Sequence, residues 1–312
     1  MNEGDPLETV GPLTGADRLR RFLFEDAPVR GHWVRLGRAW QDAREHQQLP
    51  FAVMSLLGES LAATSLIAAS LKFKGTLTLQ LSGGTGPVTM LVSQATDAGT
   101  VRGVAHADAA FAGPAADFQE LVGGGRLVVS VEQGDGEIPW QGVVPLEGED
   151  LASSLEHYFA VSEQLPTAIV LAADSAHAAG LLLQKLPAPG SQGESEAAIV
   201  QDVWEEATAL LNTLKSEELL AWDVDELLRK LFGNRDVRLF DGEAVRFACR
   251  CSRERVAAML QSMGKAEMDS IIAEQGQVTV TCEFCRKPYG FDAVDAAALF
   301  IPGKSKASQD LN

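Results

Sequence analysis

The chain has 312 residues, of which 26 are Lys or Arg and 43 are Asp or Glu, so its formal net charge is −17. Such an acidic chain repels polyphosphates and anionic lipid headgroups, so we expect neither nucleic acid nor a membrane as a partner. A length of 312 residues and an apolar content of 46% are ordinary for a globular protein and exclude a small disulfide scaffold.

The N-terminal segment and the most apolar stretch both argue for a cytoplasmic protein. Residues 1–15 have no basic region followed by an apolar one, which predicts a short disordered lead rather than a signal peptide. The stretch 53–71 contains Gly58 and Glu59 and several Ser and Thr residues, which falls short of a membrane span. In a cytoplasm the four thiols are normally kept reduced.

The first half of the chain alternates strand-like and helix-like segments. Residues 33–36 predict a short strand, residues 39–46 a helix, and residues 51–71 a long, Ala-rich, largely buried helix. Residues 75–81 and 87–92 alternate between apolar and polar side chains and are joined by a glycine-rich turn. These two runs predict a β-hairpin.

The same alternation continues to about residue 187. Further strands are predicted at 101–105, 125–131 and 167–173, helices at 115–121 and 151–162, and a closing apolar run at 178–184. Such a mixture predicts an α+β core domain, in which helices pack on an antiparallel sheet.

Several features that resemble functional motifs have simpler explanations. Residues 83–87 (GGTGP) lack the GK[ST] of a phosphate loop and open no helix, which favours a hairpin turn. The glycines at 123–125 likewise predict a turn before a strand. The histidines show no metal-ligand spacing and support no catalytic assignment; they are His32, His46, His106, His157 and His177.

A domain boundary is predicted at 187–193 (PAPGSQG), because Pro, Gly and Ser there sustain neither a strand nor a helix. Beyond it, apolar residues recur at helical spacing in two segments, 199–214 and 219–231. Gly233 is expected to end the second of these segments. The helices have an apolar face but little core of their own, so we expect them to dock on a neighbour.

The cysteines form two close pairs, Cys249 with Cys251 and Cys282 with Cys285, separated by residues 252–281. Four soft thiolate ligands suit one tetrahedral Zn²⁺ per chain. They would fill the coordination shell and leave no position for water, which argues against hydrolysis at the metal.

The residues between the pairs predict a compact module. Ser252 can cap a helix that runs to Met263, residues 266–275 predict a second helix ended by Gly276, and residues 278–281 predict a strand that leads to the second pair.

Two interpretations of the zinc site stay open on the residues alone, and a purely structural zinc module is the favoured one. The other is a redox switch, because a cysteine pair separated by one or two residues can close to a disulfide when an oxidant attacks a thiolate. Closing either pair removes two ligands. Zinc contributes roughly 10–16 kcal/mol of folding free energy in small zinc peptides, so its loss should unfold the module.

The sequence resembles the heat shock protein 33 family, the redox-regulated holdases also called 33 kDa chaperonins. The resemblance lies around the cysteines at 237–240 (VRLF), 245–256 (VRFACRCSRERV), 282–285 (CEFC) and 289–291 (YGF), and in the first domain at 29–31, 34–36, 56–59, 71–75 and 184–187. It extends over nearly all of the chain except the first fifteen or so residues and the tail after Gly303.

The resemblance implies an ATP-independent chaperone rather than an enzyme, inactive when reduced and zinc-bound and activated by oxidation with zinc release. It implies that Cys282–Cys285 is the first disulfide to form and Cys249–Cys251 the second. The linker would then unfold and expose apolar surface to unfolding client proteins. Our hypothesis is that the linker segments of Trp204 and Trp222 are regulatory. Active members of the family are homodimers.

The sequence thus predicts a disordered lead at 1–15, an α+β core domain at 16–193, a helical linker at 194–236, a zinc-binding redox-switch domain at 237–300 and a tail at 301–312. The alternative functions are a zinc-stabilised protein-binding adaptor without a redox response and a metalloenzyme. A catalytic zinc would need a water ligand, which a fourth thiolate forbids.

Overall fold

The computed structural model describes residues 17–45, 47–111, 113, 117–133, 140–187 and 194–300. The chain divides into two compact units, Met1–Phe247 and Ala248–Asn312. The predicted lead, the predicted tail and most of the predicted boundary at 187–193 lie outside the described residues.

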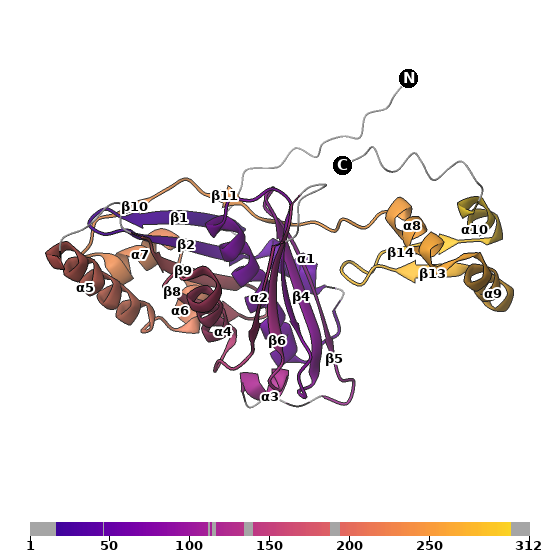
Figure 1. Ribbon diagram of the computed structural model, residues 1–312, viewed down its shortest axis with the longest axis horizontal. Coiled ribbons are helices and arrows are strands. Elements are labelled where there is room, and N and C mark those ends of the chain that lie inside the picture. The colour runs from indigo at the N-terminus through magenta and orange to yellow at the C-terminus, as the bar shows by residue number, and fades with distance from the viewer. Residues whose placement is uncertain are drawn as a thin grey trace, which may run out of the picture. The chain divides into compact units, whose positions relative to one another are not determined.

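The first unit contains a sheet in which all pairings are antiparallel, with the strand order β10-β1-β2-β9-β8 and β11 also beside β1 (Figure 1). Its strands are β1 (Arg18–Phe24), β2 (Val29–Leu36), β8 (Thr167–Ala173), β9 (Ala178–Lys185), β10 (Val237–Leu239) and β11 (Glu243–Ala244). The strand predicted at 33–36 is the second half of β2, whereas β1 was not predicted.

A second sheet of the same unit has the order β12-β5-β4-β3-β6-β7, with β12 parallel to β5 and the other pairings antiparallel. Its strands are β3 (Thr76–Ser82), β4 (Val88–Thr96), β5 (Thr100–Ala107), β6 (Arg126–Glu132), β7 (Trp140–Pro145) and β12 (Arg246–Phe247). The α+β class is confirmed, but the expectation of one sheet is corrected to two.

The predicted hairpin is confirmed, because β3 and β4 pair from Thr76↔Thr96 to Ser82↔Met90. Its turn packs closely against the turn that precedes β6. A Cβ atom on Gly84 would lie 1.6 Å from the carbonyl oxygen of Val122, so glycine is required where the two turns meet.

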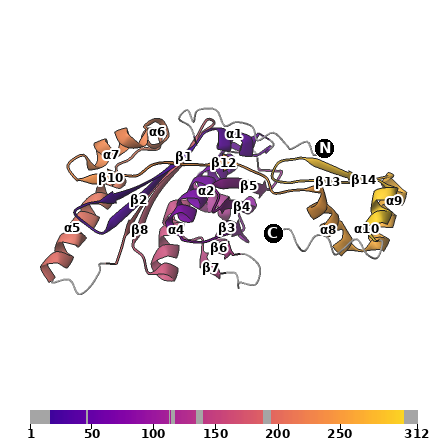
Figure 2. The same cartoon turned by 90° about the horizontal axis from the view of Figure 1, so that it is seen from above.

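Helix α2 (Phe51–Ser70) contacts strands of both sheets and forms the centre of the larger core (Figure 2). By length and composition it could cross a membrane, but 72% of its most apolar window is buried inside the protein. The prediction of a long, largely buried helix is confirmed. Its buried hydroxyls are satisfied, since Ser93 Oγ on β4 lies 2.6 Å from both Ser60 Oγ and Thr64 Oγ1.

The remaining helices of this core are short. They are α1 (Arg38–Arg44), α3 (Phe118–Val122), α4 (Leu151–Tyr158) and the π-helical turn η1 (Phe159–Glu163). The helix predicted at 39–46 is α1, and the one predicted at 151–162 is α4 followed by η1.

Three linker helices cover the other face of the first sheet (Figure 1). They are α5 (Glu194–Leu211), α6 (Ser216–Ala221) and α7 (Val224–Phe232). Their buried residues, among them Val203, Leu211, Leu219, Leu227 and Phe232, pack against Phe22, Phe24, Trp33, Leu181 and Leu183 of the sheet. The predicted docking on a neighbour is confirmed, and the second predicted segment is two helices rather than one.

A few polar contacts supplement this apolar packing. Arg35 on β2 donates from Nη1 to the carbonyl oxygens of Ala221 at 3.3 Å and Trp222 at 3.2 Å, at the end of α6. Beyond α7, Arg235 forms ion pairs with Asp26, at 2.7 Å, and with Glu206 on α5. Arg35 thus holds the end of α6 against the sheet, and Arg235 joins the C-terminal end of the linker to the turn between β1 and β2 and to α5.

The second unit contains α8 (Arg253–Met263), α9 (Lys265–Gln275), the hairpin of β13 (Val278–Thr281) and β14 (Pro288–Phe291), and α10 (Ala293–Leu299). Ser252 caps α8 by accepting the N–H of Arg255 at 3.2 Å, and Gly276 ends α9 with a φ of 80°. Both predicted helices and the strand are confirmed. The fully buried core is small, with Leu260, Met268, Val278, Tyr289, Phe291 and Ala296.

Phe232 should be a main anchor of the linker, because its ring centroid lies 5.1 Å from that of Phe24 and 6.3 Å from that of Phe22. We expect Phe232→Ala to lower the free energy of unfolding of the linker helices by about 3 kcal/mol. Hydrogen exchange of α7 amides measures this loss. Phe51→Ala is the matched control, since Phe51 is 74% exposed and should change stability by less than about 0.5 kcal/mol. Equal effects of the two substitutions would contradict the assigned docking.

Glu59 on α2 makes stability dependent on pH. Burial raises its pKa to about 7, the charge of Asp150 adds to the rise, and a hydrogen bond with Ser55 opposes it. Because the ordinary pKa is 4.5, the folded state binds the proton more tightly than the unfolded state does. The resulting stabilisation is complete below pH 4.5 and is lost as the pH rises through about 7.

Glu59→Gln should therefore remove this pH dependence and stabilise the chain by about 2 kcal/mol at about pH 8. Urea denaturation at a series of pH values measures the effect. Glu217→Gln, at an exposed position on α6, should leave the profile of the original chain unchanged. A profile that keeps its slope in Glu59→Gln would assign the pH dependence to other groups.

Candidate functional site

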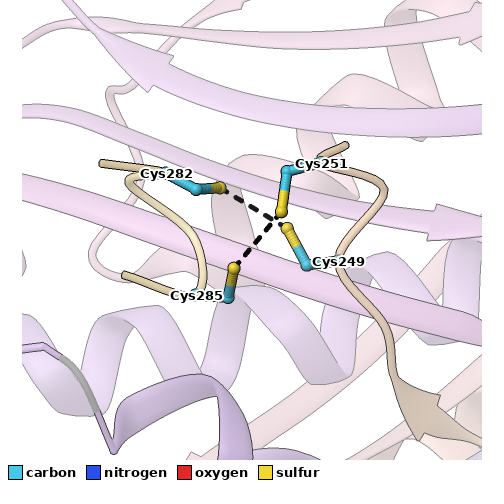
Figure 3. A group of neighbouring side chains, drawn as sticks. All are labelled: Cys249, Cys251, Cys282 and Cys285. Carbon is cyan, nitrogen blue, oxygen red and sulfur yellow. Dashed lines mark hydrogen bonds between the residues drawn. The ribbon is translucent and has the colours of Figure 1, made fainter. Parts of the chain in front are cut away.

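The four cysteines come together in the second unit (Figure 3). Cys249 and Cys251 lie in the segment before α8, and Cys282 and Cys285 lie in the turn between β13 and β14. All four are partly buried, and their Sγ atoms lie within 4.8 Å of one another. Among the described residues this is the group of His, Cys, Asp and Glu side chains that could share one ion.

The sulfur separations fit a metal better than a disulfide. Cys249 Sγ lies 3.5 Å from Cys282 Sγ, and Cys251 Sγ lies 3.4 Å from Cys285 Sγ. A disulfide would need about 2.05 Å, and none of the four cysteines is in a disulfide. Tetrahedral zinc, with Zn–S bonds of about 2.3 Å, needs sulfurs about 3.8 Å apart. The donor set is therefore compatible with zinc in both number and spacing.

The backbone of the β13–β14 turn presents the second pair. The N–H of Cys282 donates to the carbonyl oxygen of Lys287 at 3.0 Å, and the N–H of Arg286 donates to that of Cys282 at 2.7 Å. Arg286 has a φ of 55°, in the left-handed region, which reverses the chain between Cys285 and β14.

Arg253 connects the first pair to the rest of the unit. It follows the first pair at the start of α8 and donates to the carbonyl oxygen of Gly290 on β14 and to Asp295 on α10, both at 2.7 Å. Its guanidinium carbon also lies 4.2 Å from the ring centroid of Phe291. The segment that carries Cys249 and Cys251 is thus held against the hairpin that carries the second pair.

The sulfurs differ in their surroundings. Burial raises the pKa of Cys285 to about 12 and raises that of Cys249 as well. At Cys251 burial is outweighed by a hydrogen bond from the hydroxyl of Tyr289, at 3.1 Å, and by the neighbouring sulfurs, which lower the pKa to about 7. In the sequence Tyr289 stands out only as part of the motif at 289–291, and no local pattern indicates its contact with Cys251.

The histidines in the described part of the chain take no part in the cysteine cluster. His32 is buried on β2, where burial and the nearby Arg30 and Arg21 lower its pKa to about 3 and outweigh a hydrogen bond with the backbone of Ala69. His46 lies outside the described residues. The glycine-rich residues 83–87 form the turn between β3 and β4, as expected.

Comparisons with known proteins place the chain in one family. A family model described as Hsp33 protein matches residues 17–292. A 33 kDa chaperonin of Nitrosococcus oceani is 43% identical over 288 residues, which cover 92% of this chain and 96% of the relative. A 33 kDa chaperonin of Shewanella sediminis is 43% identical over 284 residues, which cover 91% and 96% of the two chains.

A solved structure shares the fold. The crystal structure of the 33 kDa chaperonin (heat shock protein 33 homolog) of Thermotoga maritima matches with a TM-score of 0.75 and 25% identity. The match covers 91% of this chain and 97% of the other. The resemblance seen in the sequence is confirmed, and the chain belongs to the Hsp33 family.

Proposed function

We propose that this chain is a redox-regulated, ATP-independent holdase, inactive when reduced and zinc-bound and activated by disulfide formation with zinc release. Its relatives are named 33 kDa chaperonins, which supports a chaperone that binds other proteins rather than an enzyme. The observation that carries the redox part is the cluster of four sulfurs within 4.8 Å in a unit that has little other core.

The four cysteines would hold one zinc ion, which when bound would cross-link the two cysteine-bearing segments and keep the thiolates deprotonated. The second unit would depend on this link, because only six of its described residues form a buried core. A core of this size supplies little stability to a small domain.

Disulfide formation by a peroxide balances in atoms and electrons. Two thiolates give up two electrons and form a sulfur–sulfur bond, while a peroxide accepts the electrons, loses its O–O bond and leaves as two hydroxide ions. We propose Cys282–Cys285 as the first pair and Cys249–Cys251 as the second. Each new disulfide removes two ligands, so the second unit should lose its cross-link and unfold.

The linker is proposed as the element that the site controls, within a core domain at 16–193, a linker at 194–236 and a switch domain at 237–300. Strands β10 to β12 connect α7 to Cys249 along the chain and pair with β1 and β5. They are two or three residues long, so unfolding that begins at residue 248 can spread through them to α7.

Release of the linker would uncover apolar surface suitable for client proteins. The covered sheet face contains Phe22, Phe24, Trp33, Leu181 and Leu183, all of them buried. An apolar surface of this kind would bind unfolding proteins, and two such surfaces would favour a homodimer in the oxidised form. We propose that the protein acts in the cytoplasm during oxidative stress.

Activation by peroxide is the first prediction of this function. The reduced, zinc-bound chain should not prevent aggregation of a thermally unfolding client, whereas the peroxide-treated chain should prevent it without ATP. Light scattering, thiol titration and a colorimetric zinc assay should show protection, loss of four thiols and release of one zinc in parallel. Reduction in the presence of zinc is the control and should reverse all three. Equal protection in both states would instead support the redox-insensitive adaptor.

The second prediction concerns the linker. After oxidation, the amides of α5, α6 and α7 should lose most of their protection from hydrogen exchange, because their docked face is released. The amides of α2 provide the internal control and should stay protected, since α2 is buried in the other core of the first unit. Linker protection that is unchanged by oxidation would exclude the linker as the controlled element.

A further inference from the structure

Tyr289 lies between the core of the second unit and the sulfur cluster. It is in β14, four residues after Cys285, and only 7% of it is exposed. Its ring belongs to the same cluster as Leu260, Met268 and Phe291, while its hydroxyl lies 3.1 Å from Cys251 Sγ. One side chain thus belongs both to the core and to the immediate surroundings of the site.

The hydrogen bond from Tyr289 differs in kind from those at two other sulfurs. Cys249 Sγ accepts the backbone N–H of Cys251, and Cys285 Sγ accepts the backbone N–H of Lys287. Any residue except proline could supply those donors. The donor at Cys251 is a side chain that a single substitution removes without changing the backbone.

A hydroxyl that donates to a thiolate stabilises its charge and occupies a lone pair that would otherwise attack an oxidant. We infer that Tyr289 is a positioning residue that delays oxidation of Cys251, so that disulfide formation begins at Cys282–Cys285. This inference rests on the proposed redox function and explains the order of its two steps.

The same contact couples the second oxidation step to unfolding. A disulfide sulfur carries no negative charge and accepts a hydrogen bond weakly, so oxidation of Cys251 leaves the buried hydroxyl of Tyr289 without a good partner. Tyr289 also pairs in the hairpin with Val280, two residues before Cys282. Loss of the hydrogen bond to Cys251 should therefore destabilise both the core and the hairpin that carries the other cysteine pair.

The test is Tyr289→Phe in the full, reduced and zinc-loaded chain, which keeps the ring and removes the hydroxyl. After a limiting dose of peroxide, free thiols are alkylated and disulfides are mapped by mass spectrometry over time. We expect the initial rate of Cys249–Cys251 formation, relative to Cys282–Cys285, to rise about tenfold, the lower end of the effect of a hydrogen bond to a charged group.

Tyr158→Phe is the matched control, because Tyr158 is the other of the chain's two tyrosines. It is also buried, and its hydroxyl donates to Glu163 at the same distance of 3.1 Å, in the first unit. This substitution should leave the order of disulfide formation unchanged. An equal change in both variants would show that loss of a buried hydroxyl, and not the contact with Cys251, alters the order.

A second measurement detects the contact without oxidation. With cobalt(II) in place of zinc, the sulfur-to-cobalt charge-transfer absorption should shift in Tyr289→Phe and not in Tyr158→Phe. Incorporation of 3-fluorotyrosine into the Tyr158→Phe chain places a stronger hydroxyl donor at position 289 alone and should slow oxidation of Cys251.

The outcomes separate the inference from the function on which it rests. Ordered disulfides in the original chain, with the same order and cobalt spectrum in Tyr289→Phe, would overturn the role of Tyr289 alone. A chain that forms no disulfide and keeps its zinc would overturn the redox function and, with it, the inference.

Discussion

The close packing of four ionisable sulfurs is the constraint on which the rest of the structure depends. Four Sγ atoms lie within 4.8 Å of one another, and two thiolates about 4 Å apart repel by about 4 kcal/mol near a protein surface. This repulsion is relieved by a shared cation, by protonation or by sulfur–sulfur bonds. A shared zinc ion and a disulfide require different distances between the sulfurs, about 3.8 Å around zinc and about 2.05 Å in a disulfide. The cluster is therefore suited to two distinct covalent states, and a protein can use two such states as a switch.

The two units differ in how much they depend on that cluster. The first unit has two cores, one centred on α2 between the sheets and one under the linker helices, and neither includes a cysteine. The second unit has a small core whose neighbours include Cys251 and Cys282 themselves. A change at the sulfurs should therefore destabilise the second unit far more than the first. Selective loss of one unit while a folded scaffold persists is what a regulated chaperone requires.

Local chemistry explains which features could be predicted from the sequence. The cap of α8 by Ser252, the end of α9 at Gly276 and the β3–β4 hairpin each depend on residues within a few positions. The number of sheets could not be predicted, because β1 pairs with β10 more than 200 residues later. The two close cysteine pairs indicated that the four sulfurs come together, but the contact of Tyr289 with Cys251 joins residues 38 positions apart and depends on how β14 packs.

The connection between site and linker also follows from strand length. Strands β10, β11 and β12 contain three, two and two residues, and they lie at the edges of two sheets that are complete without them. Short edge strands contribute few hydrogen bonds and open at low free-energy cost. They are also the only path along the chain from Cys249 back to α7, where Arg235 holds the linker through Asp26 and Glu206. Unfolding that begins at the cysteines therefore passes through β12, beside Val245 and Phe247 of the α2 core, and then through β11 and β10 before it reaches the polar contacts of the linker.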